Sequence, residues 1–269
     1  MLNSHFAFIG GGNMAEALIR GLISGGVNAA SITVAEPVES RRGHLRMNYG
    51  VTTAITPRET VDTADILILA VKPQVAPEVF TELGPAVREG TLVISVMAGV
   101  STSSIERPFV NPVRVIRVMP NTPALALEGA TAIAAGSSAT VSDIRLAEDI
   151  FGLVGKTWVI EEKLMDAVTG LSGSGPAYVL TFIEALADAG VKNGLPRDTA
   201  LGIAIQTVLG SARLLQETGE HPAILKEKVT SPGGTTIAGL YALEIRGFRG
   251  TVMGGVDAAV QRSRELGGK

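Results

Sequence analysis

The stretch Phe6-Ala-Phe-Ile-Gly-Gly-Gly-Asn-Met-Ala15 decides the fold of the N-terminal half of the chain. It begins with four apolar residues, which predict a short buried strand, and apolar residues at helical spacing follow it. Between strand and helix, Gly10, Gly12 and Ala15 form the pattern G-x-G-x-x-A. Because of this context we predict a dinucleotide-binding site, the alternative being a tight turn that binds nothing.

Each small residue of the pattern has a physical role. Gly10 lets the chain turn sharply out of the strand, and Gly12 leaves room for a pyrophosphate to approach the backbone. Ala15 lets the helix pack tightly on the strand. The start of the helix offers free N–H groups and the positive end of its dipole to the phosphates.

The composition limits the class of protein. The chain has 269 residues, enough for two domains, and 46% of them are hydrophobic against 18% charged. This balance suits an aliphatic, helix-rich core with extra surface to bury between subunits. A net charge of −3 without a basic stripe argues against a nucleic-acid partner. The absence of cysteine excludes disulfides, thiol nucleophiles and zinc sites built on sulfur.

The termini and apolar windows lead us to expect a cytoplasmic protein with no membrane partner. Residues 1–5 lack the basic region and long apolar run of an export signal. The longest charge-free window, residues 167–183, contains three glycines and a proline, which disfavours a membrane span. We also predict no metal site, since no H-E-x-x-H sequence occurs.

The second strand is expected at Ser31–Ala35, with Glu36 at its end. An acidic residue about twenty positions after the glycines commonly accepts the ribose 2′-hydroxyl of NAD. Arg41 and Arg42 follow closely and are alternatively placed to reach a 2′-phosphate, or all three are surface charges. The preference between NAD and NADP therefore stays open.

A nearly continuous apolar run at Ala64–Val71 predicts a parallel strand covered on both faces. Ligands of such sheets lie beyond the carboxyl ends of the strands, so residues 70–73 are a candidate cofactor contact. Lys72 lies in this contact, although an isolated lysine there is often only a solvated charge. Before this strand, Thr56–Glu59 is a capping box that predicts the start of a helix.

Further strands complete an α/β, doubly wound sheet of the Rossmann type. They are expected at 91–95, 113–118, 129–134 and 158–160, with a helix at 142–153 and a βα-type crossover before each strand. Two loops at strand ends are notable: Val96–Gly99, made of small residues, and Met119–Pro123, where two prolines present Asn121.

After about residue 160 the strand signal ends and an all-helical domain is predicted. Its helices are expected at 161–168, 175–193, 199–217, 222–229, 235–246 and 251–264. The helix 199–217 is apolar around most of its circumference, so a second chain is expected to cover it. We therefore divide the chain into a cofactor domain, 1–160, and a helical dimerisation and substrate domain, 161–269.

The helical half contains two glycine-rich loops, Ser172–Tyr178 and Thr230–Thr236. In the second, Gly233 and Gly234 leave the backbone accessible and the following helix start offers unpaired N–H groups. Because the loop has no lysine or arginine, it suits a small carboxylate better than a phosphate. The alternative is a helix cap without a ligand.

The inventory of acid–base residues is small. The three histidines are expected at the surface, and Glu161, Glu162 and Asp166 are expected to form a solvated face. A carbonyl reductase needs a proton donor at the carbonyl oxygen, usually His, Lys or Tyr. An imine nitrogen is basic enough to arrive protonated, so backbone N–H groups and threonine hydroxyls suffice for it.

These residues resemble the pyrroline-5-carboxylate reductase family, which catalyses the last step of proline biosynthesis. The similarity runs nearly the full length of the chain. The motifs that carry it are Ile9-Gly-Gly-Gly-Asn-Met-Ala15, Ala70-Val-Lys-Pro73, Val118-Met-Pro-Asn-Thr-Pro123, Leu171-Ser-Gly-Ser-Gly-Pro-Ala-Tyr178 and Val229-Thr-Ser-Pro-Gly-Gly-Thr-Thr236.

The resemblance implies an enzyme that uses reduced NADP or NAD to reduce 1-pyrroline-5-carboxylate to L-proline. It implies cofactor contacts at Ile9, Gly10, Gly11, Gly12, Asn13, Met14, Glu36, Ala70, Val71, Lys72, Pro73, Val96, Met97, Ala98 and Asn121. It implies substrate contacts at Ser231, Gly233, Gly234, Thr235 and Thr236, whose backbone holds the carboxylate. Thr236 is the implied catalytic residue, because its hydroxyl hydrogen-bonds the ring nitrogen.

Members of this family form homodimers through the helical domain, and the dimers often assemble into decamers. Many members have a small polar residue where this chain has Glu36, which again leaves the cofactor preference open. Two other functions are kept as alternatives. One is a related reductase of another cyclic imine or of a hydroxy acid, and the other is a nicotinamide-binding protein without turnover.

Overall fold

The computed structural model describes residues 4–267 of the chain, which form two compact units. The first contains residues 4–174 together with 258–267, and the second contains residues 175–257. The long helix α11 (Phe248–Leu266) contributes to both units. Its last turns thus belong with the sheet rather than with the other late helices.

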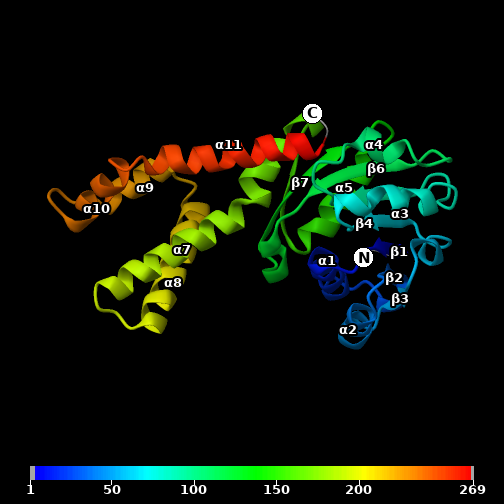
Figure 1. Ribbon diagram of the computed structural model, residues 1–269, viewed down its shortest axis with the longest axis horizontal. Helices are drawn as coiled ribbons and strands as arrows, with labels where there is room; N and C mark the ends of the chain where they lie inside the picture. The colour runs from blue at the N-terminus through cyan, green and yellow to red at the C-terminus, as the bar shows by residue number, and fades with distance from the viewer. Residues whose placement is uncertain (1–3, 268–269) are drawn as a thin grey trace. The chain divides into compact units, whose positions relative to one another are not determined.

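The first unit is built on one eight-stranded sheet (Figure 1). Its strands are β1 (Phe6–Ile9), β2 (Ile32–Ala35), β3 (Thr52–Ala54), β4 (Ile66–Leu69), β5 (Leu92–Ser95), β6 (Arg114–Met119), β7 (Gly129–Ala135) and β8 (Gly155–Val159). Their order across the sheet is β3-β2-β1-β4-β5-β6-β7-β8. Strand β1 pairs in parallel with β2 on one side and β4 on the other. The strand order reverses at this point, so the topological switch point lies beside the glycine loop.

Side chains that alternate along the strands build a separate core on each face of the sheet. In β1, Phe6 and Phe8 join one apolar cluster and Ala7 and Ile9 join another. The helices of this unit are α1 (Asn13–Ser24), α2 (Glu39–Tyr49), α3 (Ala76–Leu83), α4 (Thr102–Glu106), α5 (Val141–Gly152) and α6 (Met165–Val168). Those that supply the first cluster include α1 and α5, whereas α3 and α4 supply the second. The predicted doubly wound α/β fold is confirmed.

Three details of the sheet differ from the sequence prediction. The strand β3 was not predicted, because its three residues are polar or small and only partly buried. Strand β7 is antiparallel to β6, since a single 3₁₀ turn (Thr122–Ala126) joins them where we expected a βα crossover. The Thr56 capping box starts only a 3₁₀ turn, Pro57–Thr60, in which Thr56 Oγ1 donates to Glu59 Oε1 at 2.7 Å.

The second unit is entirely helical within the residues described. It contains α7 (Gly175–Lys192), α8 (Arg197–Thr218), α9 (Pro222–Lys228), α10 (Thr235–Glu244) and the first part of α11. The expected helix 161–168 is instead a 3₁₀ turn, Glu162–Leu164, followed by the single α-turn of α6. A π-helical turn, Thr169–Gly173, then leads to α7.

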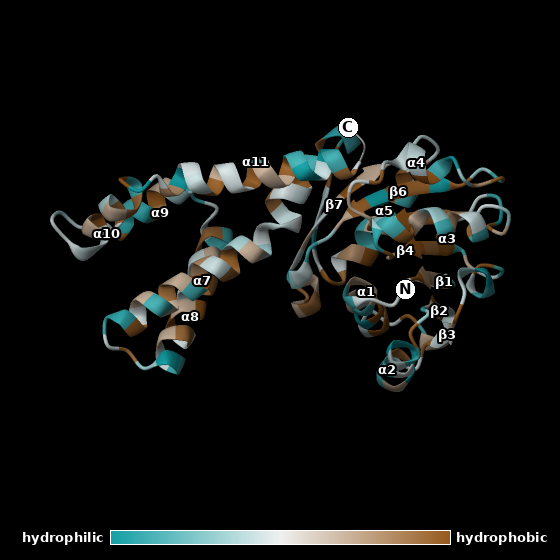
Figure 2. Ribbon diagram, viewed as in Figure 1, coloured by the Kyte–Doolittle hydropathy of each residue, from teal (hydrophilic) through white to brown (hydrophobic). Residues whose placement is uncertain are grey.

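Large apolar side chains remain exposed on α8, as expected for a surface that a second chain covers. The most exposed of them are Ile203 at 54% and Leu209 at 55%. Figure 2 shows the hydrophobic residues spread along this helix and its neighbours. No helix among residues 4–267 is long and apolar enough to cross a membrane.

Candidate functional site

The glycine loop between β1 and α1 has the geometry of a tight strand-to-helix turn. Gly10 has a φ of +96°, and a Cβ added there would lie 2.7 Å from the carbonyl oxygen of Ala70 at the end of β4. The Gly10 N–H donates to Ala35 O at 2.9 Å. The loop is therefore fixed between the ends of β2 and β4, and only glycine fits at position 10.

Gly12 differs from Gly10 because nothing surrounds it. Its backbone is extended, with φ −69° and ψ −174°, and no heavy atom lies within 4 Å of an added Cβ. It is the N-cap of α1, and no hydrogen bond among residues 4–267 uses the N–H groups of Asn13, Met14 or Ala15. Free amides around an open space are what a pyrophosphate requires, so these residues fit a dinucleotide.

Glu36 lies at the end of β2 and is buried, with 9% of its surface exposed. Its carboxylate accepts hydrogen bonds from Gly11 N at 2.9 Å and from Val38 N at 3.0 Å. Arg42, also buried, donates from Nη1 to Glu36 O at 2.6 Å and from Nη2 to Glu39. The acidic residue is thus beside the phosphate loop, and Arg42 is already paired.

Arg41 and Glu16 hold the other side of the glycine loop. Arg41 donates from Nε to Gly11 O and from Nη2 to the Glu16 carboxylate. The same carboxylate accepts from Tyr49 Oη at 2.8 Å and contacts His44 Nε2 at 2.8 Å. Both polar groups of the Gly11 peptide are therefore occupied, the N–H by Glu36 and the carbonyl by Arg41.

The pKa of Glu16 gives a pH-dependent contribution to stability. Burial alone raises this pKa, but hydrogen bonds from His44, Arg41 and Tyr49 outweigh it and lower the pKa from 4.5 to about 2. Because the folded-state pKa is depressed, the carboxylate stabilises the fold above the unfolded pKa, and this contribution is lost as the pH falls from 4.5 toward about 2.

Between about pH 5 and about pH 2.5, the free energy of unfolding in urea should fall by on the order of 1 kcal/mol more in the wild type than in Glu16→Gln. Glu82→Gln, which removes an exposed carboxylate of α3, is the control and should follow the wild type. An equal acid sensitivity in wild type and Glu16→Gln would show that the Glu16 cluster adds no stability.

Cofactor preference is expected to depend on Glu36. Replacing Glu36 with serine, together with Glu16→Gln to release Arg41, should raise the affinity for NADP⁺ relative to NAD⁺ by about tenfold. The substitution removes a negative charge at the predicted ribose position and leaves an arginine free for a 2′-phosphate. Calorimetric titration of both nucleotides measures the ratio, and Glu82→Gln, which removes an exposed carboxylate of α3 away from both arginines, is the control. An unchanged ratio would remove Glu36 as the ribose contact.

Two further loops leave the carboxyl ends of neighbouring strands. Residues 70–73 follow β4, with Lys72 exposed, and Pro73 begins a 3₁₀ turn (Pro73–Val75). Residues 96–98 follow β5, where Met97 is buried and its N–H donates to Ser95 Oγ at 3.3 Å. Because β1, β4 and β5 are adjacent and parallel, these loops and the glycine loop share one edge of the sheet.

The side chain of Asn121 joins two of the sequence motifs. Its Oδ1 accepts from Ala130 N at 2.9 Å, and its Nδ2 donates to Ser172 Oγ at 3.1 Å. A Cβ at Gly173 would lie 2.6 Å from Met119 Cε, so the two motifs also pack directly. The amide of Asn121 is therefore used within the protein, which leaves its predicted contact with the cofactor untested.

The loop before α10, where we predict an anion site, lies in the helical unit. Gly233 has a φ of +66°, and Gly234 is the N-cap, with its N–H donated to Ser231 O at 3.1 Å. Within residues 4–267, the N–H groups at positions 235–237 have no hydrogen-bond acceptor. The Thr236 side chain is half-buried at this helix start. Together they offer a carboxylate several backbone donors without a charged side chain.

The expectation of a solvated acidic face was wrong for two of its three residues. Glu162 accepts hydrogen bonds from the backbone and the hydroxyl of Thr102, both at 2.7 Å, and pairs with the buried Arg117. Asp166 is buried and accepts from Ser263 Oγ at 2.9 Å. No local sequence signal marks these contacts, because the partners lie 45 to 97 positions apart.

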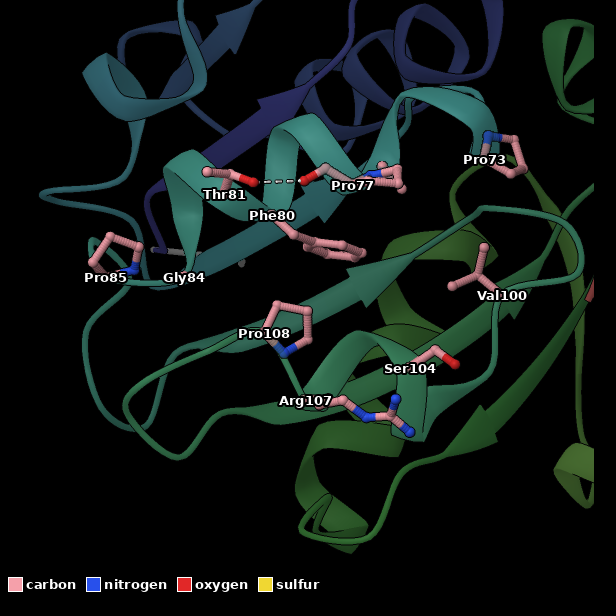
Figure 3. Close-up of a pocket in the computed structure, with 11 residues that line it drawn as sticks. Pro73, Pro77, Phe80, Thr81, Gly84, Pro85, Val100, Ser104, Arg107 and Pro108 are labelled. Carbon is pink, nitrogen blue, oxygen red and sulfur yellow. Dashed lines mark hydrogen bonds between the residues drawn. The ribbon is translucent and has the colours of Figure 1, made fainter.

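An open pocket of about 630 Å³ lies between α3 and α4 in the sheet unit (Figure 3). Its walls are mostly apolar, with Phe80 and four prolines, and Arg107 lies at its edge. Pro73, in the loop after β4, and Val100, in the loop after β5, also line it. The pocket therefore borders both loops.

Comparison with known proteins identifies both parts of the chain. Residues 162–266 match the family described as pyrroline-5-carboxylate reductase dimerisation. Residues 5–99 match NADP oxidoreductase, coenzyme F420-dependent.

Similar proteins cover the whole chain. A pyrroline-5-carboxylate reductase from Synechocystis is 48% identical over 100% of both chains. A solved pyrroline-5-carboxylate reductase from Coxiella burnetii is 37% identical, with a TM-score of 0.91 over 98% of this chain and 99% of that one. The Plasmodium falciparum enzyme, solved with NADP bound, is 34% identical with a TM-score of 0.90, over 99% of each chain. The chain therefore belongs to the pyrroline-5-carboxylate reductase family.

Proposed function

We propose that this protein transfers a hydride from NADPH or NADH to the C=N carbon of 1-pyrroline-5-carboxylate and so forms L-proline. The observation that carries the proposal is the Gly233–Thr236 turn, which offers free backbone donors and a hydroxyl but no charged side chain. Such a turn suits a small carboxylate whose own imine nitrogen brings the positive charge. The relatives named pyrroline-5-carboxylate reductase support the same reaction.

In this mechanism the chain binds and orients the reactants. When bound, the reduced nicotinamide supplies the hydride. The open space at Gly12 and the free amides of α1 would hold its pyrophosphate, and Glu36, beside the glycine loop, would contact the adenosine ribose. The backbone of residues 233–236 binds the substrate carboxylate, and the Thr236 hydroxyl hydrogen-bonds the ring nitrogen. Alignment of the two reactants and exclusion of water supply most of the rate enhancement.

The two regions of the chain divide the work. Residues 1–160 are proposed to bind the cofactor, and residues 161–269 to hold the substrate and form the dimer. The match to a dimerisation family and the exposed apolar residues of α8 support self-association through the helices. We further propose that dimers assemble into a decamer and that the enzyme works in the cytoplasm, where reduced nicotinamide cofactors are available.

The most direct test follows the absorbance of the reduced nicotinamide with three substrates: 1-pyrroline-5-carboxylate, its six-membered-ring homologue and a hydroxy acid. Consumption of NADH or NADPH with 1-pyrroline-5-carboxylate, and little with its six-membered-ring homologue, is the expected result. Faster consumption with the homologue would indicate a different imine substrate. Nucleotide binding without turnover on any imine would indicate a nicotinamide-binding protein.

A hydroxy-acid substrate is disfavoured by the charges on α7. Reductases of this build that act on hydroxy acids use a lysine within the corresponding helix. Here Glu184 and Asp188 occupy the middle of α7, and its lysine, Lys192, is the last residue. A hydroxy acid with NAD⁺ is therefore the third substrate in the assay, and no reaction is expected.

A further inference from the structure

The loop between β5 and α4, residues 96–101, contains three of the predicted cofactor contacts and is partly packed on the sheet: Met97 is buried, and Val100 packs against the same apolar cluster. Val100 faces the open pocket beside α3 (Figure 3). The start of the loop is held by hydrogen bonds from Val96 N to Leu69 O at 3.1 Å and from Met97 N to Ser95 Oγ at 3.3 Å, and by the buried Met97 side chain. The middle and the end of the loop have further contacts, with the C-terminal turn of α11 and with Glu162.

The middle of the loop contacts the C-terminal turn of α11. Gly99 has a φ of +75°, and a Cβ added to it would lie 3.3 Å from Gly267 N. In the reverse direction, a Cβ added to Gly267 would lie 2.7 Å from Gly99 O. Two backbones without side chains are thus in van der Waals contact, which leaves no room for a side chain at position 267.

A buried hydrogen bond fixes that turn of α11. Ser263, 3% exposed, donates from Oγ to Asp166 Oδ1 at 2.9 Å. Asp166 belongs to α6, which packs beneath β7 through Met165. The turn is consequently attached to the sheet unit four residues before Gly267 and held in place against the loop.

The end of the loop is fixed by Glu162. The Glu162 carboxylate accepts from both Thr102 N and Thr102 Oγ1, and its other partner is Arg117 on β6. Burial raises the pKa of Glu162, but the Thr102 and Arg117 hydrogen bonds outweigh it and lower that pKa below its usual value. A charged carboxylate therefore binds the first residue of α4.

We infer that Gly267 and Thr102 are positioning residues for the cofactor: they hold the β5–α4 loop, which carries predicted cofactor contacts. Both act through the loop. Thr102 contacts Glu162 in the segment that matches the dimerisation family, and Gly267 directly follows that segment. The inference rests on the proposed cofactor role of Val96, Met97 and Ala98.

Gly267→Ala tests the contact with α11. The added methyl would push Gly99 O away, and a displaced loop should raise the Kd of both NAD⁺ and NADP⁺ about tenfold. The KM for 1-pyrroline-5-carboxylate and the kcat at saturating cofactor should stay near wild type. Gly152→Ala is the matched control, because it also adds a methyl near a helix end of this unit but meets no atom within 4 Å.

Thr102→Val tests the other end of the loop independently, in case Gly267→Ala fails to fold. Valine keeps the shape of the buried threonine, but its side chain cannot donate to Glu162 and only the backbone N–H still does, so the cofactor Kd should rise severalfold. Thr102→Ser, which restores the hydroxyl, should return it toward wild type. A merely structural role would lower the melting temperature and leave the Kd of the folded protein unchanged.

The outcomes separate this inference from the proposed site. If Gly12→Ala loses cofactor while Gly267→Ala and Thr102→Val bind as tightly as wild type, the positioning role is wrong and the site stands. If Gly12→Ala binds cofactor normally, the proposed site is wrong and the inference falls with it. Weakened binding in all three variants, with Gly152→Ala unchanged, supports both.

Discussion

Gly12→Ala is expected to weaken the binding of NAD⁺ and NADP⁺ at least about a hundredfold while the protein still folds. The backbone at Gly12 allows alanine, and an added Cβ meets no atom of the protein within 4 Å. The same Cβ would occupy the space in which the pyrophosphate must approach the amides of α1. Calorimetry measures the affinity, and thermal unfolding checks that the melting temperature changes by only a few degrees.

Gly10→Ala is the informative comparison for this prediction. Its Cβ would lie 2.7 Å from Ala70 O and its φ of +96° disfavours any side chain, so alanine there should lower stability as well as binding. The two variants thus distinguish a glycine needed for ligand binding from a glycine needed for folding. Normal nucleotide affinity in folded Gly12→Ala would contradict the proposed cofactor site.

Thr236→Ala is expected to lower kcat by roughly one to two orders of magnitude, the usual loss when one positioned donor is removed. Among residues 4–267 the Thr236 hydroxyl has no hydrogen-bond partner, so the substitution should leave the fold intact. The helix start would keep its backbone donors, and for that reason the KM for the imine should change less than kcat.

Steady-state kinetics with saturating cofactor measure this effect. Thr236→Ser is the control, since it keeps the hydroxyl and should recover most of the turnover, and the cofactor Kd should be equal in all three proteins. Wild-type turnover in Thr236→Ala would remove Thr236 from the mechanism and leave the backbone amides as the only contribution of this loop.

Features that depend on neighbouring residues could be predicted from the sequence. The β1–α1 glycine loop and the Gly233–Thr236 turn are each specified within ten residues, by a strand or helix pattern and by glycine at fixed positions. The doubly wound sheet also followed, because long apolar runs such as the one that contains β4 predict buried parallel strands.

Features that depend on distant partners were missed. Glu162 and Asp166 have the spacing of a solvated helix face, yet each finds a partner 60 or 97 positions away. Such charges are partly or fully buried only because a hydroxyl or an arginine from another element satisfies them, and no local pattern contains that information. The antiparallel β7 was missed for a similar reason, since a short 3₁₀ turn replaces an expected helix.

The path of α11 has a practical consequence for dividing the protein. A fragment that ends at residue 174 would contain every strand but would lack Ser263 and Gly267, which the sheet unit includes. Loss of the Ser263–Asp166 hydrogen bond and of the contact at Gly99 would destabilise that fragment. An isolated nucleotide-binding half should therefore be designed as a circular permutant, with residues 258–267 fused ahead of the first strand.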